Sequence, residues 1–392
     1  MILHNAPRVR SKWNGRQAVT LSNGIVEMTL LVGGGHIASF SLTANSINSL
    51  WEAPWETADP LDPLWSVLAN RYGADPAGQF LAGYTGHALC LDIFGMPSAM
   101  EAAAGVALHG ETGVREWEID STPGACTARV TLPTAGLQLQ RDVILRESAA
   151  FVTETVTNDR DVARDIHWVQ HATFGPPMLN DSSGVIDASL EQCVTWPEGY
   201  EGRSLVRANV RFAWPNAPVE IGSHTTTLRQ PFAVHGTGFV VAALTSPNRS
   251  LQFVIARSTE HALAIGYCFR REDFPWVAIW EENCARKSPP WNSSTTARGM
   301  EFGTTPMPLG REGVAKLGEI FGTPSSVSLG SRASKQARFC MFLTHVPRDW
   351  QQITDVVAHA SGLTLRGAAA NQQLHVAANS VDKFFNAIQE EI

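Results

Sequence analysis

Short runs of alternating apolar and polar residues dominate the chain, and this two-residue period is typical of β-strands. Residues 137–145 read LQLQRDVIL and residues 166–174 read IHWVQHATF. Turn residues separate the runs, and Asn23-Gly24 is a strong hairpin signal. Further runs lie at residues 151–157, 238–244, 251–256, 276–280 and 338–344. The pattern predicts an all-β fold, a large antiparallel β-sandwich with a few peripheral helices.

No linker, internal repeat or low-complexity tract divides the sequence, so we expect residues 1–392 to form a single domain. Helical spacing of apolar residues appears late, at residues 349–359 and again at 381–388, where Ser380 is a suitable N-cap. These two segments predict C-terminal helices around residues 349–392. Residues 45–76 have no clear period and predict a long loop with a helical turn near residues 64–69.

Composition narrows the classes of function. Hydrophobic residues make up 44% of the chain and charged residues 17%, which is enough apolar material for a large core. A formal net charge of −7 argues against a nucleic-acid partner, and no apolar stretch has the length of a membrane span. The six cysteines are scattered without metal-ligand spacing and predict buried free thiols in a reducing compartment. Because no signal peptide is recognisable, we expect a cytoplasmic protein.

The run at residues 166–174 carries the first candidate for chemistry. Strand alternation places His167 and His171 on one face, opposite Trp168 and Phe174. A Gly-Pro-Pro sequence then ends the strand, so His171 lies near a sheet edge where a cleft can open. The two histidines are roughly 13 Å apart along a strand and cannot share one metal ion. His171 is therefore either a structural histidine or a lone acid, base or hydrogen-bond donor, and we predict no metal and no cofactor.

A second candidate is the pair Glu281-Glu282, which ends an apolar run. Carboxylates are rarely buried without a partner, so this segment faces either solvent or a site. Alternation along a strand indicates that only one of the two glutamates points into a cleft. The sequence leaves open which one does, and Glu301 is a further candidate carboxylate.

Several motifs, in order, resemble the galactose mutarotase-like (aldose 1-epimerase) superfamily. The hairpin and Gly-rich turn of residues 23–42, followed by NSLWEAPW, resemble the start of that family. Ala-Asn-Arg at residues 69–71 and Leu-His-Gly at 108–110 resemble its A-N-R and L-H-G motifs. His171 stands where the family has the histidine of N-H-x-Y-F-N-L, and IWEEN at residues 279–283 resembles its L-E-T-Q segment. Departures such as T-F-G-P-P in place of Y-F-N-L indicate a divergent branch.

The resemblance implies the family's supersandwich fold and a carbohydrate ligand. It implies an aldose 1-epimerase that interconverts sugar anomers, with Glu281 as the base and His171 as the acid. Arg71 and His109 would then bind sugar hydroxyls. Candidates for the remaining contacts to the sugar are Trp280, Trp291 and Glu282. Taken alone, Arg71 is equally compatible with a surface residue, and His109 with a turn-capping histidine.

Two other functions fit the same residues. The first is a non-catalytic carbohydrate-binding or sensing protein on the same scaffold, which would need Arg71, His109 and the tryptophans but no matched acid and base. The second is a metal-dependent carbohydrate enzyme in which His109, His171 and a glutamate hold one cation. No local ligand motif supports the metal site, so the epimerase is the favoured hypothesis.

Overall fold

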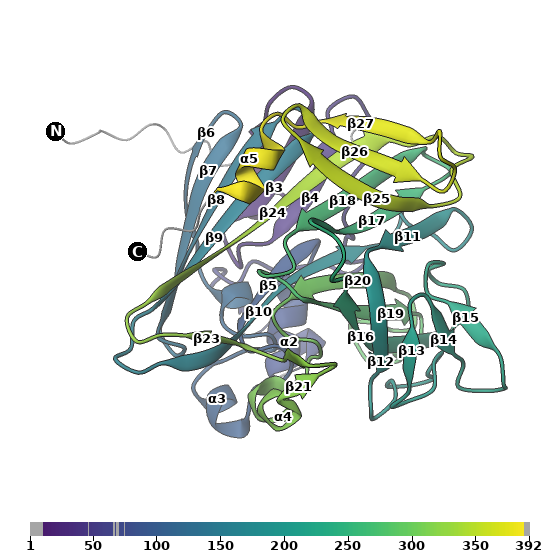
Figure 1. The fold of residues 1–392 in the computed structure, drawn as a ribbon. Coiled ribbons are helices and arrows are strands. Elements are labelled where there is room, and N and C mark those ends of the chain that lie inside the picture. The colour runs from purple at the N-terminus through teal and green to yellow at the C-terminus, as the bar shows by residue number, and fades with distance from the viewer. Residues whose placement is uncertain (1–10, 46, 66, 68–69, 74, 388–392) are drawn as a thin grey trace.

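Two large antiparallel sheets form the body of the protein (Figure 1). The computed structural model describes residues 11–45, 47–65, 67, 70–73 and 75–387. In these ranges, the larger sheet has twelve strands, in the order β1 (Ser11–Trp13), β2 (Arg16–Ser22), β3 (Val26–Leu31), β4 (Ile37–Leu42), β5 (His87–Asp92), β10 (Arg164–Phe174), β20 (Thr296–Gly303), β19 (Trp276–Asn283), β16 (Thr237–Thr245), β12 (Leu190–Thr195) and β13 (Arg211–Ala213), with β23 (Val327–Leu329) paired to β10.

The smaller sheet has eight strands in the same described ranges. Their order is β11 (Gly184–Ala188), β17 (Gln252–Ser258), β18 (Leu263–Phe269), β24 (Ser334–His345), β9 (Ala149–Asn158), β8 (Leu137–Arg146), β7 (Ala125–Leu132) and β6 (Glu118–Thr122). The short hairpins are β14 (Asn216–Pro218) with β15 (Thr225–Thr227), and β21 (Glu319–Ile320) with β22 (Thr323–Pro324). The all-β prediction is confirmed.

The main core lies between the two sheets, and β10 shows how alternation fills it. Trp168, Ala172 and Phe174 are fully buried in this core, together with apolar side chains from both sheets. His167 and His171 point to the other face of β10, as the sequence predicts. The face of the larger sheet that points away from the core is therefore where side chains of β10 can reach a site.

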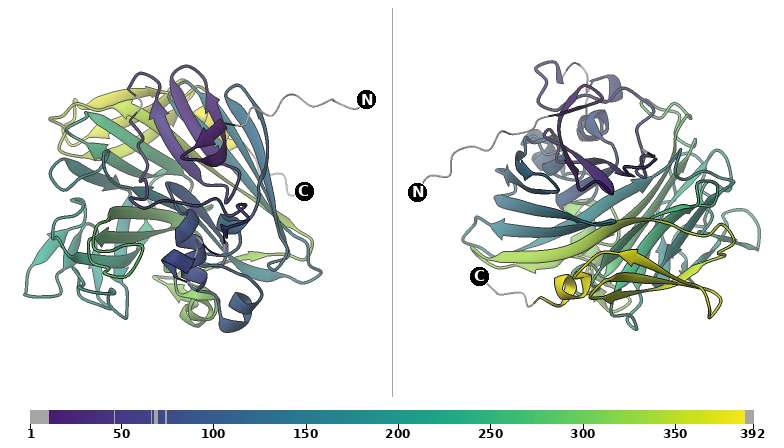
Figure 2. Two further views of the ribbon diagram at one scale, coloured as in Figure 1. Left: turned by 180° about the vertical axis from the view of Figure 1, so that it is seen from behind. Right: turned by 90° about the horizontal axis from the view of Figure 1, so that it is seen from above.

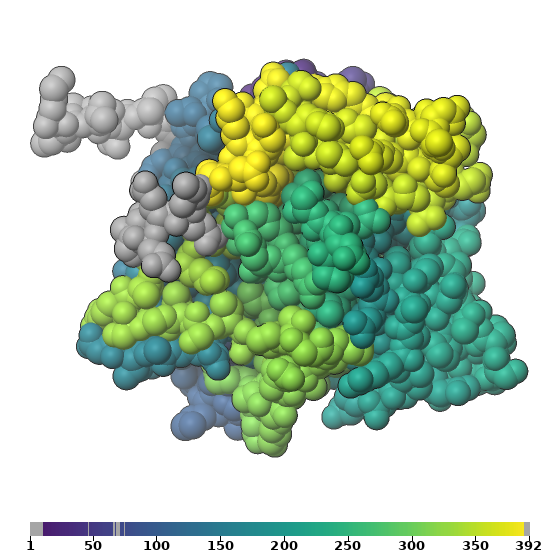
Figure 3. Space-filling model, viewed as in Figure 1, coloured from purple at the N-terminus to yellow at the C-terminus, as the bar shows by residue number. Residues whose placement is uncertain are grey.

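A C-terminal layer packs on the outer face of the smaller sheet (Figures 1 and 2). It consists of the three-stranded sheet of β25 (Ile353–His359), β26 (Gly362–Gly367) and β27 (Gln373–Ala377), followed by α5 (Val381–Asn386). In the space-filling view it covers one side of the molecule (Figure 3). Apolar residues of β25, β26 and α5 contact Phe151 and Phe253 of the smaller sheet and form a second core.

This layer corrects the prediction of C-terminal helices around residues 349–392. The segment at 349–359 is not a helix, because residues 353–359 form strand β25. A register shift between Ile353 and Asp355 places an extra residue in the strand, so the buried Ile353 and Val356 are three residues apart and imitate a helical spacing. The second predicted helix exists as α5, but Ser380 has a left-handed backbone (φ 67°) and its side chain makes no capping hydrogen bond.

Other helices are short and lie near one end of the larger sheet: η1 (Asn70–Tyr72), α2 (Pro76–Gly83), α3 (Ala99–Ala103), η2 (Thr112–Val114) and α4 (Gly310–Leu317). Asp75 is the N-cap of α2: its side chain accepts a hydrogen bond from the Gly78 amide at 2.9 Å, and Pro76 occupies the first helical position. The predicted turn near residues 64–69 lies partly outside the described residues. No helix in the described ranges is long and apolar enough to cross a membrane.

Candidate active site

A cavity of about 190 Å³ opens on the face of the larger sheet that points away from the main core. Its floor comes from β10, β19 and β20, and α2 and several loops form its walls. Carbohydrate and other small-molecule pockets commonly enclose about 300–1,000 Å³, so this one fits a single small ring rather than a chain of sugars. It is lined by Phe80, Leu81, Tyr84, Gly95, Met96, Leu108, His109, His171, Val240, Trp280, Arg286, Trp291, Glu301 and Pro308.

His171 lies on the floor, held from one side by two hydroxyls. Its Nδ1 is 2.9 Å from the Tyr84 hydroxyl and 3.1 Å from the Thr173 hydroxyl. Its Nε2 is 3.2 Å from Oε1 of Glu301 on the neighbouring strand β20. Burial lowers the pKa of His171 to about 3, so the imidazole is neutral at ordinary pH.

Glu301 is the carboxylate that the fold brings to His171. Glu301 is 2% exposed, and this burial raises the pKa of its carboxyl group well above the usual range. Among the described residues Oε1 accepts no aligned hydrogen bond, although Nε2 of His171 is in contact distance. The arrangement favours a neutral pair, in which the proton sits on the carboxyl group and His171 presents a lone pair on Nε2. Gly299 makes room for this carboxyl group, because a Cβ there would overlap Oε1 of Glu301.

His109 stands on the wall beside this pair. Its backbone is left-handed (φ 65°), and its Nδ1 accepts a hydrogen bond from the Gly95 amide at 3.1 Å. That bond places the proton of the neutral ring on Nε2. The ring lies edge-on to His171, with centroids 5.4 Å apart, and burial lowers the pKa of His109 well below its usual value. His109 is therefore a neutral donor next to the pair, rather than only a turn residue.

The opposite wall is aromatic and carries Arg286, a residue that sequence reasoning missed. The rings of Trp280 and Trp291 lie 5.7 Å apart. The guanidinium carbon of Arg286 is 5.0 Å from the Trp291 ring and 4.9 Å from the Tyr200 ring. These cation–π contacts, together with ion pairs from Nε to Glu201 at 3.5 Å and to Glu282 at 3.7 Å, hold Arg286 in place, and its terminal N–H groups are left to bind a ligand. The sequence signal that points to Arg286 is its position shortly after the pair Glu281-Glu282.

Glu282 supports this wall without lining the pocket. One carboxylate oxygen accepts from the Tyr200 hydroxyl at 2.7 Å, and the other accepts from the amides of Ala285 and Arg286 at 2.5 and 3.0 Å. Tyr200 in turn accepts a hydrogen bond from Nε1 of Trp280 at 2.9 Å. Glu282 therefore fixes the turn that presents Arg286.

Glu281 points to the other side of the sheet, into the main core. Its carboxylate forms a buried ion pair with Arg298, its cross-strand partner on β20, and accepts a hydrogen bond from the Phe232 amide at 3.0 Å. Strand alternation is the physical reason, because neighbouring residues on β19 face opposite sides. The structure therefore does not bring Glu281 to His171.

Arg71 also lies away from the cavity. Its side chain is 59% exposed and is 3.7 Å from the carboxylate of Glu56, which is 82% exposed. Exposed pairs of this kind contribute little to stability. Of the residues predicted from the sequence, the structure brings together His171, His109, Trp280 and Trp291, together with Glu301.

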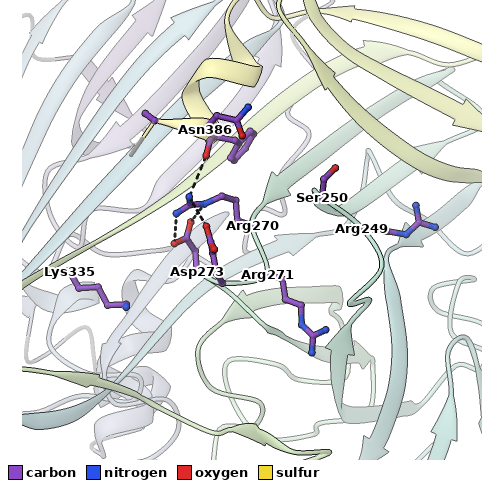
Figure 4. Close-up of a pocket in the computed structure, with 10 residues that line it drawn as sticks. Arg249, Ser250, Arg270, Arg271, Asp273, Lys335 and Asn386 are labelled. Carbon is purple, nitrogen blue, oxygen red and sulfur yellow. Dashed lines mark hydrogen bonds and ion pairs between the residues drawn. The ribbon is translucent and has the colours of Figure 1, made fainter. Parts of the chain in front are cut away.

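A larger polar hollow near α5 has a different character (Figure 4). Arg270 forms two hydrogen bonds of 2.9 Å to Asp273, and its Nη1 donates to the Phe385 carbonyl at 3.3 Å. Arg270 is thus engaged by its own neighbours. Across the described ranges, no group of three or more His, Cys, Asp or Glu side chains is placed to hold a metal ion. The absence of a metal at the candidate site stays a prediction.

Comparison with known proteins identifies the fold. No protein-family model matches the chain, and no curated protein matches it. Among solved structures, a "putative aldose 1-epimerase" from Klebsiella pneumoniae has a TM-score of 0.57 at 16% identity, over 85% of this chain and 80% of that one. A galactose mutarotase-like protein from Clostridium acetobutylicum gives 0.55 at 10% identity, over 86% and 98%. A galactose mutarotase related enzyme from Lactobacillus acidophilus gives 0.54 at 13% identity, over 84% and 98%.

The chain thus has the fold of galactose mutarotase-like proteins, and the predicted resemblance is confirmed at that level. At these identities the likeness is one of fold alone.

Proposed function

We propose that the protein is an aldose 1-epimerase-like enzyme that interconverts the anomers of a small aldose. The observation that carries the proposal is the buried contact between Nε2 of His171 and Oε1 of Glu301, 3.2 Å apart on the floor of a pocket of sugar size. Anomer exchange needs one group to take the proton of the C1 hydroxyl and another to protonate the ring oxygen. This pair offers both groups.

The proton inventory balances through one cycle. Nε2 of His171 takes the proton from O1, whose electron pair forms the C1=O1 double bond. The C1–O5 bond breaks, and Glu301 donates its proton to O5. The open-chain aldehyde rotates about C1–C2, and the reverse steps close the ring on the other face of C1. The two protons that move are those of the C1 hydroxyl and of the Glu301 carboxyl group.

Direct contact between the two groups suits this reaction. O1 and O5 are bonded to the same carbon, so an acid and a base that lie side by side can reach both oxygens. After ring opening His171 is an imidazolium and Glu301 a carboxylate, and their mutual attraction, which is stronger in a low-dielectric site than in water, offsets part of the cost of burying the two charges. Ring closure, or direct transfer from Nε2 to Oε1, restores the neutral pair. This differs from the expectation that Glu281 is the base and His171 the acid, because His171 is now the base and Glu301 the acid.

The remaining side chains bind the sugar. His109 donates from Nε2, and Arg286 donates from its terminal N–H groups at the aromatic wall. Trp280 and Trp291 offer ring faces and edges to the C–H groups of a pyranose. Tyr84 and Thr173 hold the imidazole of His171 in the orientation that directs Nε2 toward Glu301.

The test is NMR exchange spectroscopy on a panel of aldoses, with wild type and His171→Asn side by side. We expect wild type to accelerate anomer exchange for at least one aldose, and His171→Asn to lower the rate by about 10²–10⁴-fold while its calorimetric affinity for that sugar changes little. The control is Glu312→Gln, an exposed residue of α4 outside the pocket. Wild-type exchange no faster than buffer, together with clear binding of one sugar, would favour a non-catalytic carbohydrate-binding protein instead.

A further inference from the structure

The lining of the candidate site is mostly apolar, which is unusual for a pocket that is to hold a sugar with a hydroxyl on nearly every carbon. Around the His109 end stand Met96, Leu108 and Pro308, and Phe80 lies edge-on to His109 with centroids 5.1 Å apart. With about 190 Å³ available, a bound pyranose is in contact with these side chains rather than separated from them by a layer of water.

Few polar groups remain free to serve the ligand. Tyr84 lines the cavity, but its hydroxyl is engaged by His171 and Thr173. Nε1 of Trp280 donates to Tyr200. Among the described residues that line the cavity, the polar side-chain groups left for a ligand are His109, the terminal N–H groups of Arg286, the indole N–H of Trp291, and the pair His171 and Glu301.

A hexopyranose has five hydroxyls and a ring oxygen. In the proposed reaction His171 and Glu301 act on O1 and O5, so only His109, Arg286 and the indole N–H of Trp291 are left to bind the other four hydroxyls. A buried hydroxyl without a partner loses its hydrogen bonds to water and gains none from the protein. A methyl group in its place instead gains apolar contact.

We infer that the substrate class is the 6-deoxyaldohexoses, sugars in which the exocyclic carbon is a methyl group rather than a hydroxymethyl group. The inference rests on the proposed function and makes it more specific. The methyl group packs against the apolar wall of Met96, Leu108 and Pro308, while His109 and Arg286 bind ring hydroxyls. The selectivity arises from the missing partner for O6 and from the gain of an apolar contact.

The experiment compares matched sugars that differ only at C6. The rate of anomer exchange is measured for D-galactose, D-glucose and D-mannose against their 6-deoxy forms, for the L-configured pairs, and for the aldopentoses that lack C6. For at least one configuration we expect kcat/KM to be about 10–100-fold higher for the 6-deoxy sugar than for its parent, the size of effect that one unpartnered hydroxyl produces. It should exceed the value for the matching pentose by about 4-fold, which is the effect of one buried methyl group.

A pair of methionine variants tests the wall itself. Met96→Gln offers O6 a partner and should shrink the preference for the 6-deoxy sugar several-fold. Because Met96 is 46% exposed at the rim, the variant should fold normally. The matched control is Met100→Gln, since Met100 is 83% exposed and lies outside the cavity, and it should leave the preference unchanged.

The possible results separate this inference from the proposed function. Exchange of parent hexoses at rates equal to or above those of their 6-deoxy forms overturns the inference and leaves the epimerase proposal standing. If no aldose is exchanged, the epimerase proposal fails, and calorimetric affinities for the same pairs decide the inference: a 10-fold preference for a 6-deoxy sugar supports it, and equal affinities overturn it.

Discussion

Strands β19 and β20 carry three buried glutamates, and two of them, Glu281 and Glu301, lie on opposite faces of the sheet and have different partners. On the core face Glu281 pairs with Arg298, which also donates to the Leu228 carbonyl at 2.8 Å. On the pocket face Glu301 contacts His171, and among the described residues Oε1 of Glu301 accepts no aligned hydrogen bond. The two carboxylates lie in the same sheet, twenty residues apart in sequence.

The difference lies in what each partner can do with a proton. A guanidinium keeps its protons at any ordinary pH and holds a carboxylate in a fixed, charge-assisted geometry, so the pair of Glu281 and Arg298 is suited to fixing structure. An imidazole can gain and lose a proton, so Glu301 and His171 can exchange one. Whether a glutamate here is suited to a structural or a chemical role depends on the side of the sheet on which it lies and on the residue it contacts there.

The largest expected effect comes from Glu301→Gln, which removes the acid but keeps the size of the side chain. Under the proposed mechanism the rate of anomer exchange should fall by about 10²–10⁴-fold. Because burial already disfavours the charged form of Glu301, the free energy of unfolding should stay the same or rise slightly. Exchange rates and denaturant unfolding of the same preparation check both. A variant that retains wild-type exchange would remove Glu301 from the mechanism.

Glu281→Gln should instead lower the stability of the protein and leave the rate of anomer exchange unchanged. Arg298 would keep its charge in the core without a carboxylate, which typically costs about 3–5 kcal/mol of unfolding free energy. The remaining folded protein should exchange anomers at the wild-type rate. The control is Glu312→Gln, which removes a glutamate from an exposed ion pair with Lys316 and should change stability by under about 1 kcal/mol. Loss of exchange with unchanged stability in Glu281→Gln would return the role of base to Glu281.

The stability of the protein should depend on pH through His171, which lies on the pocket face of the sheet. Burial lowers the pKa of His171 to about 3, below its unfolded value near 6.5, so the folded state binds fewer protons between these values. The contribution of His171 to stability is therefore complete above about pH 6.5 and is lost as the pH falls toward 3, at roughly 1 kcal/mol per pH unit. Denaturant unfolding of wild type and His171→Asn at several pH values measures this slope. An identical slope in the two proteins would contradict it.

The rate of anomer exchange, unlike stability, should fall at high pH. The pKa of Glu301 is raised well above its usual range, so the carboxyl group keeps its proton as pH rises past 4.5 and loses it only at higher pH. Anomer exchange should therefore decline on the alkaline side, as the acid is lost. The profile of kcat/KM against pH measures this decline. A rate that rises steadily through the alkaline range is the result that would count against Glu301 as the acid.

The smallest effect is expected at Arg71, which the family resemblance places in the sugar site. Its side chain is 59% exposed and is paired with exposed Glu56. Arg71→Ala should change affinity and stability by less than about 0.5 kcal/mol. Arg286→Ala is the matched comparison and should weaken sugar binding clearly, because Arg286 lines the cavity. The reverse order of effects in calorimetry would restore Arg71 to the site.

The sequence alone determined the all-β character, the hairpin near Asn23-Gly24 and the two faces of β10. These features depend on a two-residue period and on turn residues, both of which are local. The same reading failed at residues 349–359, where a register shift in β25 turned strand spacing into an apparent helix. It also overlooked α2, although Asp75-Pro76 gives a start signal for that helix.

Tertiary structure decided which carboxylate meets His171. Alternation showed that only one of Glu281 and Glu282 could enter a cleft, but neither lines the cavity. Glu301 reaches His171 because β20 lies between β10 and β19, with Gln170 paired to Phe302 and Glu301 to Ala278. Strand order and register bring together His171 and Glu301, which are 130 positions apart. Both are set by packing of the whole sheet rather than by the local residue pattern. The sequence could therefore supply the candidate residues but not show which two meet.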